Sequence, residues 1–166
     1  ENAVLNGDKY SETFLSEIIN AKAIKGRHIS MESIYEYGSR AGFWRLDRLF
    51  KEKKIPVTIF GVGLALDQNP EVCEAIKKGD YEVAAHGYRW IDYQNIKKSV
   101  EKKHMHQAIK TIKNIFGSRP LGWYTGRCSP NTRDLVFDDG GFLYDSDSYS
   151  DDLPYWENRG KKRQLI

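Results

Sequence analysis

The chain has 166 residues, of which 40% are hydrophobic and 30% charged, a composition that suits one ordinary globular domain with one substantial core. The formal net charge of +3 is too small to indicate nucleic-acid binding, and the lysine clusters at 51–54 and 97–103 are interpreted as solvated helix faces. No apolar run approaches the ~20 residues that span a bilayer, so neither a nucleic acid nor a membrane is an expected partner. Cys73 and Cys128 lack metal-type spacing, and we expect free thiols in a reducing cytoplasm.

Helical and strand patterns alternate along the chain. Helices are predicted at 10–23, 39–54, 70–79, 96–116 and 131–140. Strands are predicted at 55–61, 81–86, 121–126 and 141–144, and a further strand starts near 163. The helix at 39–54 has Ser39 as its expected N-cap, and its apolar face consists of Phe43, Leu46, Leu49 and Phe50. Residues 24–38 show no clear helical period and are expected to form a loop. Such alternation is typical of βα units around a parallel sheet or barrel, and no linker or repeat interrupts it, so we predict one domain over residues 1–166.

Polar side chains follow three of the predicted strands directly. His86 ends the strand at 81–86, Arg127 follows the strand at 121–126, and Asp145 and Asp147 follow the strand at 141–144. Because the carboxyl ends of parallel strands meet at one edge, these side chains are expected to share a site. Each residue alone also has a structural interpretation, such as a partly buried histidine or a loop-capping aspartate.

Several longer strings of residues resemble one protein family. These strings are Tyr35-Glu-Tyr-Gly-Ser-Arg-Ala-Gly-Phe-Trp-Arg45, Ala85-His-Gly-Tyr-Arg-Trp-Ile-Asp-Tyr93, Gly122-Trp-Tyr-Thr-Gly-Arg127, and Tyr144-Asp-Ser-Asp147 through Asp151-Asp-Leu-Pro-Tyr-Trp156. The chain is similar to the polysaccharide deacetylase (NodB homology) superfamily, and more narrowly to its allantoinase-like branch. The resemblance implies a distorted (β/α) barrel, a hydrolase of non-peptide carbon–nitrogen bonds and, commonly, a homo-oligomer.

The chain departs from the family pattern at the metal site. Typical members hold a divalent metal with an aspartate and two histidines four residues apart; here His86 matches the first histidine, but Trp90 stands at the second position. Catalytic zinc sites usually take three protein ligands, so no cofactor is expected and zinc is the less favoured alternative. His104 and His106 lie two residues apart on a predicted helix and therefore face different sides. The allantoinase-like branch shows the same loss and is understood to work without a metal.

A second departure concerns the acidic motif that supplies the family's catalytic base. In this branch that motif would precede Glu1, and the strand near residue 163 is expected to continue into further barrel strands, so an incomplete barrel is predicted. Val136-Phe-Asp-Asp-Gly140 imitates the missing aspartate pair, but we interpret it as the end of the helix that begins near Asn131, with Gly140 and Gly141 as the stop.

Roles for the predicted site follow from the chemistry of amide hydrolysis. His86 is the predicted acid/base, because its ordinary pKa near 6.5 allows both protonation states near neutrality. Arg127 matches the family's arginine and would hold a carboxylate or stabilise negative charge, while Asp145 or Asp147 would pair with His86 or Arg127 unless it caps a loop. Candidate substrate contacts are Tyr88, Arg89, Trp90, Trp123 and Tyr149, joined by Glu36, Tyr37 and Arg40 from the first string; aromatic packing and a Glu36–Arg40 ion pair are the structural alternatives.

Three functional hypotheses remain open from the sequence. The first is a metal-independent hydrolase of a cyclic amide or ureide such as allantoin, or a related deacylase that uses the same residues. The second is a metal-dependent polysaccharide or peptidoglycan N-deacetylase, which is less favoured because Trp90 stands at the position of a metal-binding histidine. The third is an inactive fragment that acts as a binding or assembly partner.

Overall fold

A computed structural model describes residues 7–11 and 22–166. The chain forms two compact units, residues 1–55 and residues 56–166. Most of the predicted helix at 10–23 lies outside the described residues. Among the described residues, no helix is long and apolar enough to cross a bilayer.

The first unit contains a continuous helical run instead of a loop followed by a capped helix. α1 (Ile29–Tyr37) passes through a π-helical turn (Gly38–Gly42) into α2 (Phe43–Lys53). The predicted N-cap at Ser39 is wrong. Gly38 and Gly42 keep right-handed helical dihedral angles, and the Ser39 hydroxyl donates back to the Glu36 carbonyl at 3.2 Å, so the helix continues through Ser39. The expected loop at 24–38 is wrong for 29–37, where mixed polar and apolar residues hide the helical period.

α2 ends where the sequence predicts, at Lys54, which adopts a left-handed conformation. Its predicted apolar face is less buried than expected, since Leu46 and Leu49 are exposed. The buried residue on α2 is instead Asp47, whose carboxylate accepts from the Lys51 ammonium at 2.9 Å. Helical periodicity identifies an apolar stripe, but it does not encode what covers that stripe.

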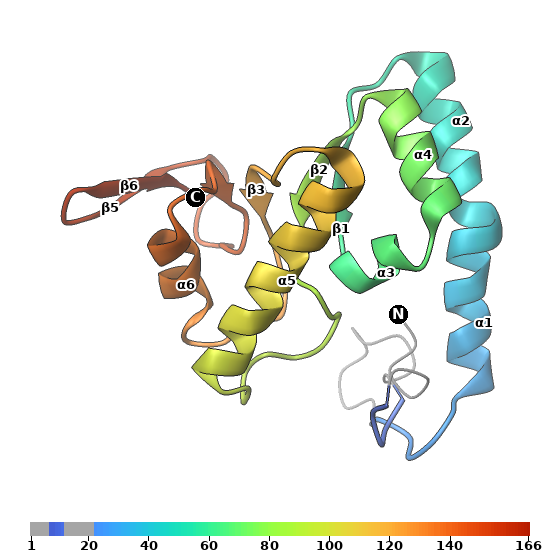
Figure 1. The fold of residues 1–166 in the computed structure, drawn as a ribbon, viewed down its shortest axis with the longest axis horizontal. Helices are drawn as coiled ribbons and strands as arrows, with labels where there is room; N and C mark the ends of the chain where they lie inside the picture. The colour runs from blue at the N-terminus through green and yellow to red at the C-terminus, as the bar shows by residue number, and fades with distance from the viewer. Residues whose placement is uncertain (1–6, 12–21) are drawn as a thin grey trace. The chain divides into compact units, whose positions relative to one another are not determined.

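The second unit is built on a parallel sheet, as predicted. Its strands are β1 (Thr58–Gly61), β2 (Glu82–Ala85), β3 (Gly122–Trp123), β4 (Tyr144–Asp145), β5 (Trp156–Arg159) and β6 (Lys162–Leu165), in the spatial order β1-β2-β3-β4-β6-β5. All neighbours pair in parallel except β5 and β6, which form an antiparallel hairpin (Figure 1). The described sheet is open, with β1 and β5 as its outer strands, which matches an incomplete (β/α) barrel.

Helices follow the parallel strands and cover the sheet. They are α3 (Gly63–Asp67), α4 (Pro70–Gly79), α5 (Lys98–Phe116) and α6 (Thr132–Asp139). α3 is a short helix without a full period and was not predicted, and α5 starts two residues later than predicted. Gly140 ends α6 with φ of 69°, so Val136-Phe-Asp-Asp-Gly140 is an ordinary helix end, as predicted.

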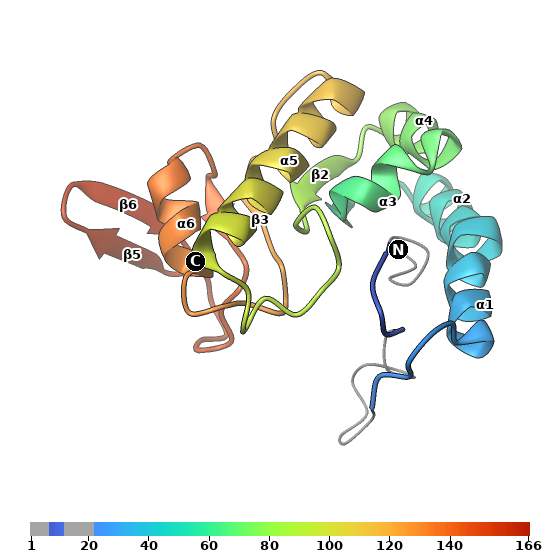
Figure 2. The same ribbon diagram turned by 60° about the horizontal axis from the view of Figure 1, so that its bottom comes forward.

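α5 packs on β2, α3 and α4 in the core of this unit, and Figure 2 shows α5 beside β2. Ala84 and Ala85 of β2 are completely buried, and Met105, Ala108 and Ile112 of α5 are at most 1% exposed. Consecutive strand residues point to opposite faces, so burial of both Ala84 and Ala85 shows that the two faces are covered at this end of β2. The carboxyl end of β2 therefore stands on a rigid base, and His86 is the next residue.

Candidate functional site

The ends of β1 and β2 are tied together beneath His86. The His86 backbone N–H donates to the Gly61 carbonyl at 2.9 Å, and the Gly63 N–H donates to the Gly87 carbonyl at 2.9 Å. Gly87 has a φ of 70°, a left-handed conformation that favours glycine directly after the histidine. The chain therefore turns sharply at the strand end and leaves His86 at the edge.

The His86 imidazole has one nitrogen committed to the backbone. Its Nδ1 lies 2.6 Å from the Tyr124 carbonyl oxygen, which can only accept, so Nδ1 carries the hydrogen and Nε2 has the lone pair of the neutral ring. The ring also stacks on Tyr124 at 5.2 Å and an interplanar angle of 5°. Burial lowers the pKa of His86, opposed by the Tyr124 carbonyl and the Asp147 charge. A neutral imidazole with Nε2 available suits a general base.

The Arg127 side chain lies on the face of the Trp90 ring. Its guanidinium carbon is 4.4 Å from the centre of the Trp90 ring, a cation–π geometry, and its carbonyl accepts from the Tyr93 N–H at 3.2 Å. The charge of Arg127 also contributes to the lowered pKa of His86. A fixed cation at this edge can stabilise the negative charge that develops on a carbonyl oxygen during hydrolysis.

Asp147 caps the loop that follows β3. One carboxylate oxygen accepts from the Gly126 N–H at 2.7 Å, and both lie 2.9 Å from the Thr125 nitrogen. The cap adjoins Tyr124, whose carbonyl holds His86. The structure thus brings Asp147 to the same edge as His86 and Arg127, and its carboxylate also takes a hydrogen bond from the Cys128 thiol.

Asp145 is buried at 1% exposure below this loop. Its Oδ1 accepts from the Asp147 N–H at 3.0 Å, and its Oδ2 has no hydrogen-bond partner among the described residues. Burial raises the pKa of Asp145 to about 6, with Arg133 opposing the shift. The carboxyl group therefore titrates close to neutrality inside the fold.

The predicted aromatic contacts divide into exposed and buried positions. Tyr149 is 80% exposed, and its hydroxyl lies 3.2 Å from that of Tyr124; this contact raises the pKa of Tyr149 to about 12. Trp123 is buried, and its ring packs edge-on against the Phe142 ring at 5.4 Å. This is the packing role that the sequence left open beside substrate contact. Tyr88 lies 6.2 Å from the His104 ring. The Arg89 carbonyl accepts from the Tyr93 hydroxyl at 3.3 Å.

Glu36, Tyr37 and Arg40 belong to the first unit. Arg40 Nη1 lies 3.8 Å from a Glu36 carboxylate oxygen, and both side chains are largely exposed. The Tyr37 hydroxyl accepts from Arg45 at 3.2 Å. The ion pair proposed from the sequence is present, although inside a continuous helix rather than at a helix start; substrate contact by these three residues stays a prediction.

The donor set at the His86 edge does not fit a zinc centre. Within residues 7–11 and 22–166, no three or more His, Cys, Asp or Glu side chains gather as metal ligands. Trp90 replaces the second histidine and carries the Arg127 cation on its face, which opposes a metal cation there. His104 Nδ1 lies 3.1 Å from the Tyr93 hydroxyl, and His106 is exposed on α5.

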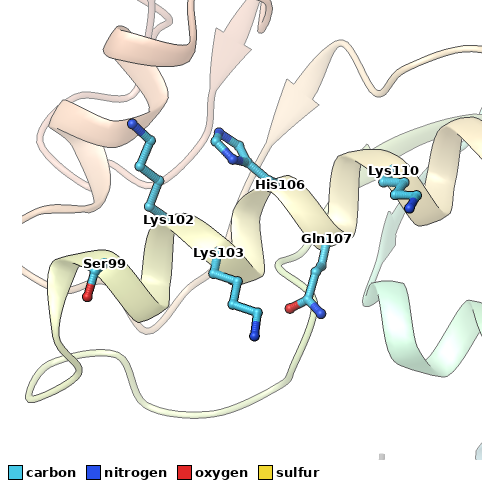
Figure 3. Close-up of a pocket in the computed structure, with 6 residues that line it drawn as sticks. All are labelled: Ser99, Lys102, Lys103, His106, Gln107 and Lys110. Carbon is cyan, nitrogen blue, oxygen red and sulfur yellow. The ribbon is translucent and has the colours of Figure 1, made fainter.

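A hollow of about 400 Å³ lies elsewhere, on the exposed face of α5. Its lining residues are Ser99, Lys102, Lys103, His106, Gln107 and Lys110 (Figure 3). All come from one helix, and their side chains point in different directions. The hollow shares no residue with the His86 edge. Because a binding site usually has polar groups that converge on one point, this hollow is not the candidate site.

The fold and the strand-end residues define an α/β protein whose potential chemistry lies at the carboxyl edge of a parallel sheet. Residues 25–138 match the polysaccharide deacetylase family, and the chain belongs to this family. A Schizosaccharomyces pombe protein (strain 972) assigned as a polysaccharide deacetylase is 41% identical over 165 residues, which cover 94% of this chain and 52% of that protein.

Two solved structures share the fold closely. A Pseudomonas aeruginosa PAO1 protein assigned as a polysaccharide deacetylase is 54% identical, with a TM-score of 0.93 over 99% of this chain and 56% of that one. PuuE allantoinase is 52% identical, with a TM-score of 0.93 and the same two coverages. The chain thus spans about half the length of the relatives it matches.

Two residues at this edge escaped the sequence analysis. Tyr124 acts through its carbonyl and its ring, and Glu101 of α5, only 3% exposed, accepts hydrogen bonds from Ser129 and Thr132. A backbone acceptor leaves no signal in residue type. An isolated glutamate in a lysine-rich helix is typical of a surface position, so only the structure identifies Glu101 as buried.

Proposed function

We propose that this protein hydrolyses a carbon–nitrogen bond other than a peptide bond, and that its substrate is a cyclic amide or ureide such as allantoin. The observation that supports this most is the 52% identity to PuuE allantoinase over 99% of the chain. The site chemistry agrees with it, because Trp90 and Arg127 occupy the place where a metal-dependent member would need a second histidine.

The proposed reaction uses His86 twice. The neutral Nε2 removes a proton from water, whose oxygen attacks the carbonyl carbon and forms a tetrahedral oxyanion. The carbon–nitrogen bond then breaks, and the proton on Nε2 moves to the leaving nitrogen. The ring returns to its neutral form, with Nδ1 still donating to the Tyr124 carbonyl.

Arg127 supplies positive charge to the oxyanion in this proposal. Its guanidinium is placed against the Trp90 ring, so less side-chain freedom is lost when the charge develops. Removing one such preorganised donor typically lowers kcat by about 100- to 1,000-fold. Tyr149 and Tyr88 are proposed to contact the flat substrate, since both lie within the family strings, Tyr149 is exposed and Tyr88 is half-buried.

A second candidate is metal-dependent N-deacylation of an acetylated sugar. The family match and the two relatives assigned as polysaccharide deacetylases favour it. It requires metal ligands that residues 7–11 and 22–166 do not bring together. It is therefore the less favoured of the two.

The two candidates separate in one substrate comparison. The purified chain, treated exhaustively with chelator, is assayed for allantoin ring opening and for acetate release from N-acetylglucosamine oligomers. We expect allantoin turnover without added metal and no acetate release. Acetate release that depends on added zinc would favour the second candidate and contradict the first.

A further inference from the structure

The segment that carries Arg127 is held at both ends by buried or half-buried carboxylates. This Arg127 segment, residues 124–132, connects β3 to α6 and also supplies the Tyr124 carbonyl that binds His86. β3 has only two residues; the Tyr124 N–H, at the start of the segment, still donates to the Ala85 carbonyl of β2 at 2.9 Å, and the residues after Tyr124 lie outside the strand. Other contacts must therefore fix its shape.

The first carboxylate is Asp147, which holds the start of the segment. It accepts the N–H groups of Thr125 and Gly126, and its own N–H donates to Asp145 at 3.0 Å. Ser146 donates to the Trp123 carbonyl at 2.8 Å, which ties the strand end to the same place. Both Asp147 oxygens accept from backbone groups, and the carboxylate also has a hydrogen bond with the Cys128 side chain inside the segment. These contacts fix a loop more directly than they would orient an imidazole.

The second carboxylate is Glu101, which holds the end of the segment from α5. Its two oxygens accept from the Ser129 hydroxyl, at 2.6 Å, and from the Thr132 hydroxyl. Each hydroxyl in turn accepts a backbone N–H, from Asn131 at 2.9 Å and from Ser129 at 2.8 Å. A carboxylate buried to 3% exposure is costly unless it is hydrogen-bonded, and here both donors belong to the Arg127 segment.

We propose that Asp147 and Glu101 are positioning residues: each fixes one end of the Arg127 segment, and together they set the place of the Arg127 guanidinium and of the Tyr124 carbonyl that fixes the His86 tautomer. The catalytic part of this inference rests on the proposed function, whereas the structural part does not. Asp147 then acts through the loop, and it need not contact His86 or the substrate.

The test compares Asp147→Ala, Asp147→Asn, Glu101→Gln and Ser129→Ala with the unaltered chain. Asp152→Asn and Glu71→Gln are matched controls, since both carboxylates are exposed. The readouts are amide hydrogen exchange at Thr125 and Gly126, the ¹⁵N ring shifts of His86, which report the tautomer, and kcat and KM for allantoin. Ser129→Ala removes one donor to Glu101 and keeps the charge, so it serves if a carboxylate variant fails to fold.

We expect Asp147→Ala to raise exchange at Thr125 and Gly126 at least about tenfold, the effect of one lost hydrogen bond, with a smaller change in Asp147→Asn, which keeps one acceptor oxygen. The His86 ring shifts should move toward a mixture of tautomers, and kcat should fall more than KM rises. Glu101→Gln and Ser129→Ala should lower kcat without altering the Asp147 cap. The controls should match the unaltered chain.

Unchanged exchange and unchanged His86 shifts in Asp147→Ala would overturn the inference. A fall in kcat that accompanies unchanged exchange at Thr125 and Gly126 would also overturn it, because Asp147 would then act directly and not through the loop. The exchange and ring-shift measurements need no substrate. If they change as expected while the unaltered chain does not hydrolyse allantoin, the positioning role stands and the proposed function fails.

Discussion

At the residue scale, His86 owes its predicted reactivity to the environment at the end of β2. Burial lowers its pKa, and the Tyr124 carbonyl fixes the hydrogen on Nδ1. The neutral ring is therefore retained at pH values where an exposed histidine is already half protonated, which is what a base near neutrality requires.

The pH dependence of activity should report this shift. Because the folded pKa of His86 lies below the ordinary value of about 6.5, the acid limb of kcat/KM should fall at a pH below about 6.5. By linkage, the stability that neutral His86 contributes is present above that value and is lost as the pH falls through the folded pKa. A pH–rate profile measures the acid limb of kcat/KM, and ¹⁵N titration of the ring measures the folded pKa of His86. An acid limb above pH 6.5 would contradict the role of His86 as the base.

Asp145 should influence stability in the opposite sense. Its folded pKa of about 6 exceeds the ordinary value of 3.8, so the native state binds more protons between these values and stability falls as the pH rises through this window. The free energy of unfolding falls by at most about 3 kcal/mol across this window. Asp145→Asn keeps the acceptor for the Asp147 N–H and should flatten the pH dependence in urea denaturation. Asp152→Asn is the exposed control, and an Asp145→Asn profile identical to that of the unaltered chain would refute the expectation.

At this scale the sequence predicts which residues reach the edge but not how they are paired. His86, Arg127 and Asp147 come after strands as predicted, whereas Asp145 is the last residue of β4, which starts only at Tyr144. Strand ends are recognisable from apolar runs that stop at glycine or polar residues. The Asp147 cap joins residues more than 20 positions apart, and the acceptor for His86 is a carbonyl. Such pairings depend on tertiary geometry that residue type does not encode.

At the element scale, the short strands β2, β3 and β4 are joined by one side chain. The Tyr144 ring of β4 lies over Gly122 of β3, and its hydroxyl donates to the Glu82 carboxylate of β2 at 2.8 Å. The same carboxylate accepts from Thr58 of β1 at 2.7 Å. Glycine at position 122 therefore leaves the space that the tyrosine ring occupies.

Gly122→Ala should destabilise the protein, because its Cβ would overlap the Tyr144 ring. The expected loss is about 1 to 3 kcal/mol in the free energy of unfolding, measured by urea denaturation. In a Tyr144→Ala background the same change should cost much less. Gly38→Ala is the control, since Gly38 is helical and nothing lies within 4 Å of its Cβ position. Equal costs in both backgrounds would rule out the ring contact as the cause.

Elements with a strong period were predictable and short or mixed elements were not. The helix at 70–79 has proline at its start and the strand at 82–85 is an apolar run, so both were predicted within two residues. α3 spans only five residues, and the π-helical turn at 38–42 joins two helices through glycines that normally signal a break. β5 is mostly charged and polar, and its pairing with β6 defines it as a strand.

At the scale of the whole molecule, the parallel sheet and the family assignment agree, and the family strings were the stronger signal. The α/β alternation predicts a parallel sheet but does not distinguish an open sheet from a barrel. The described sheet has an open order from β1 to β5, and the fold matches two longer chains with a TM-score of 0.93 over 56% of each of them. Division of the chain after Ile55 has no counterpart in the sequence pattern.

We propose that this chain hydrolyses a ureide with His86 and without a metal. The measurement that tests it most directly is allantoin turnover by the chelated chain, with His86→Ala beside it and the exposed-histidine variant His106→Ala as the matched control. We predict turnover in the unaltered chain and in His106→Ala, and loss of at least about 100-fold in His86→Ala with an unchanged circular dichroism spectrum. Turnover that survives in His86→Ala, or that appears only when zinc is restored, would contradict the account.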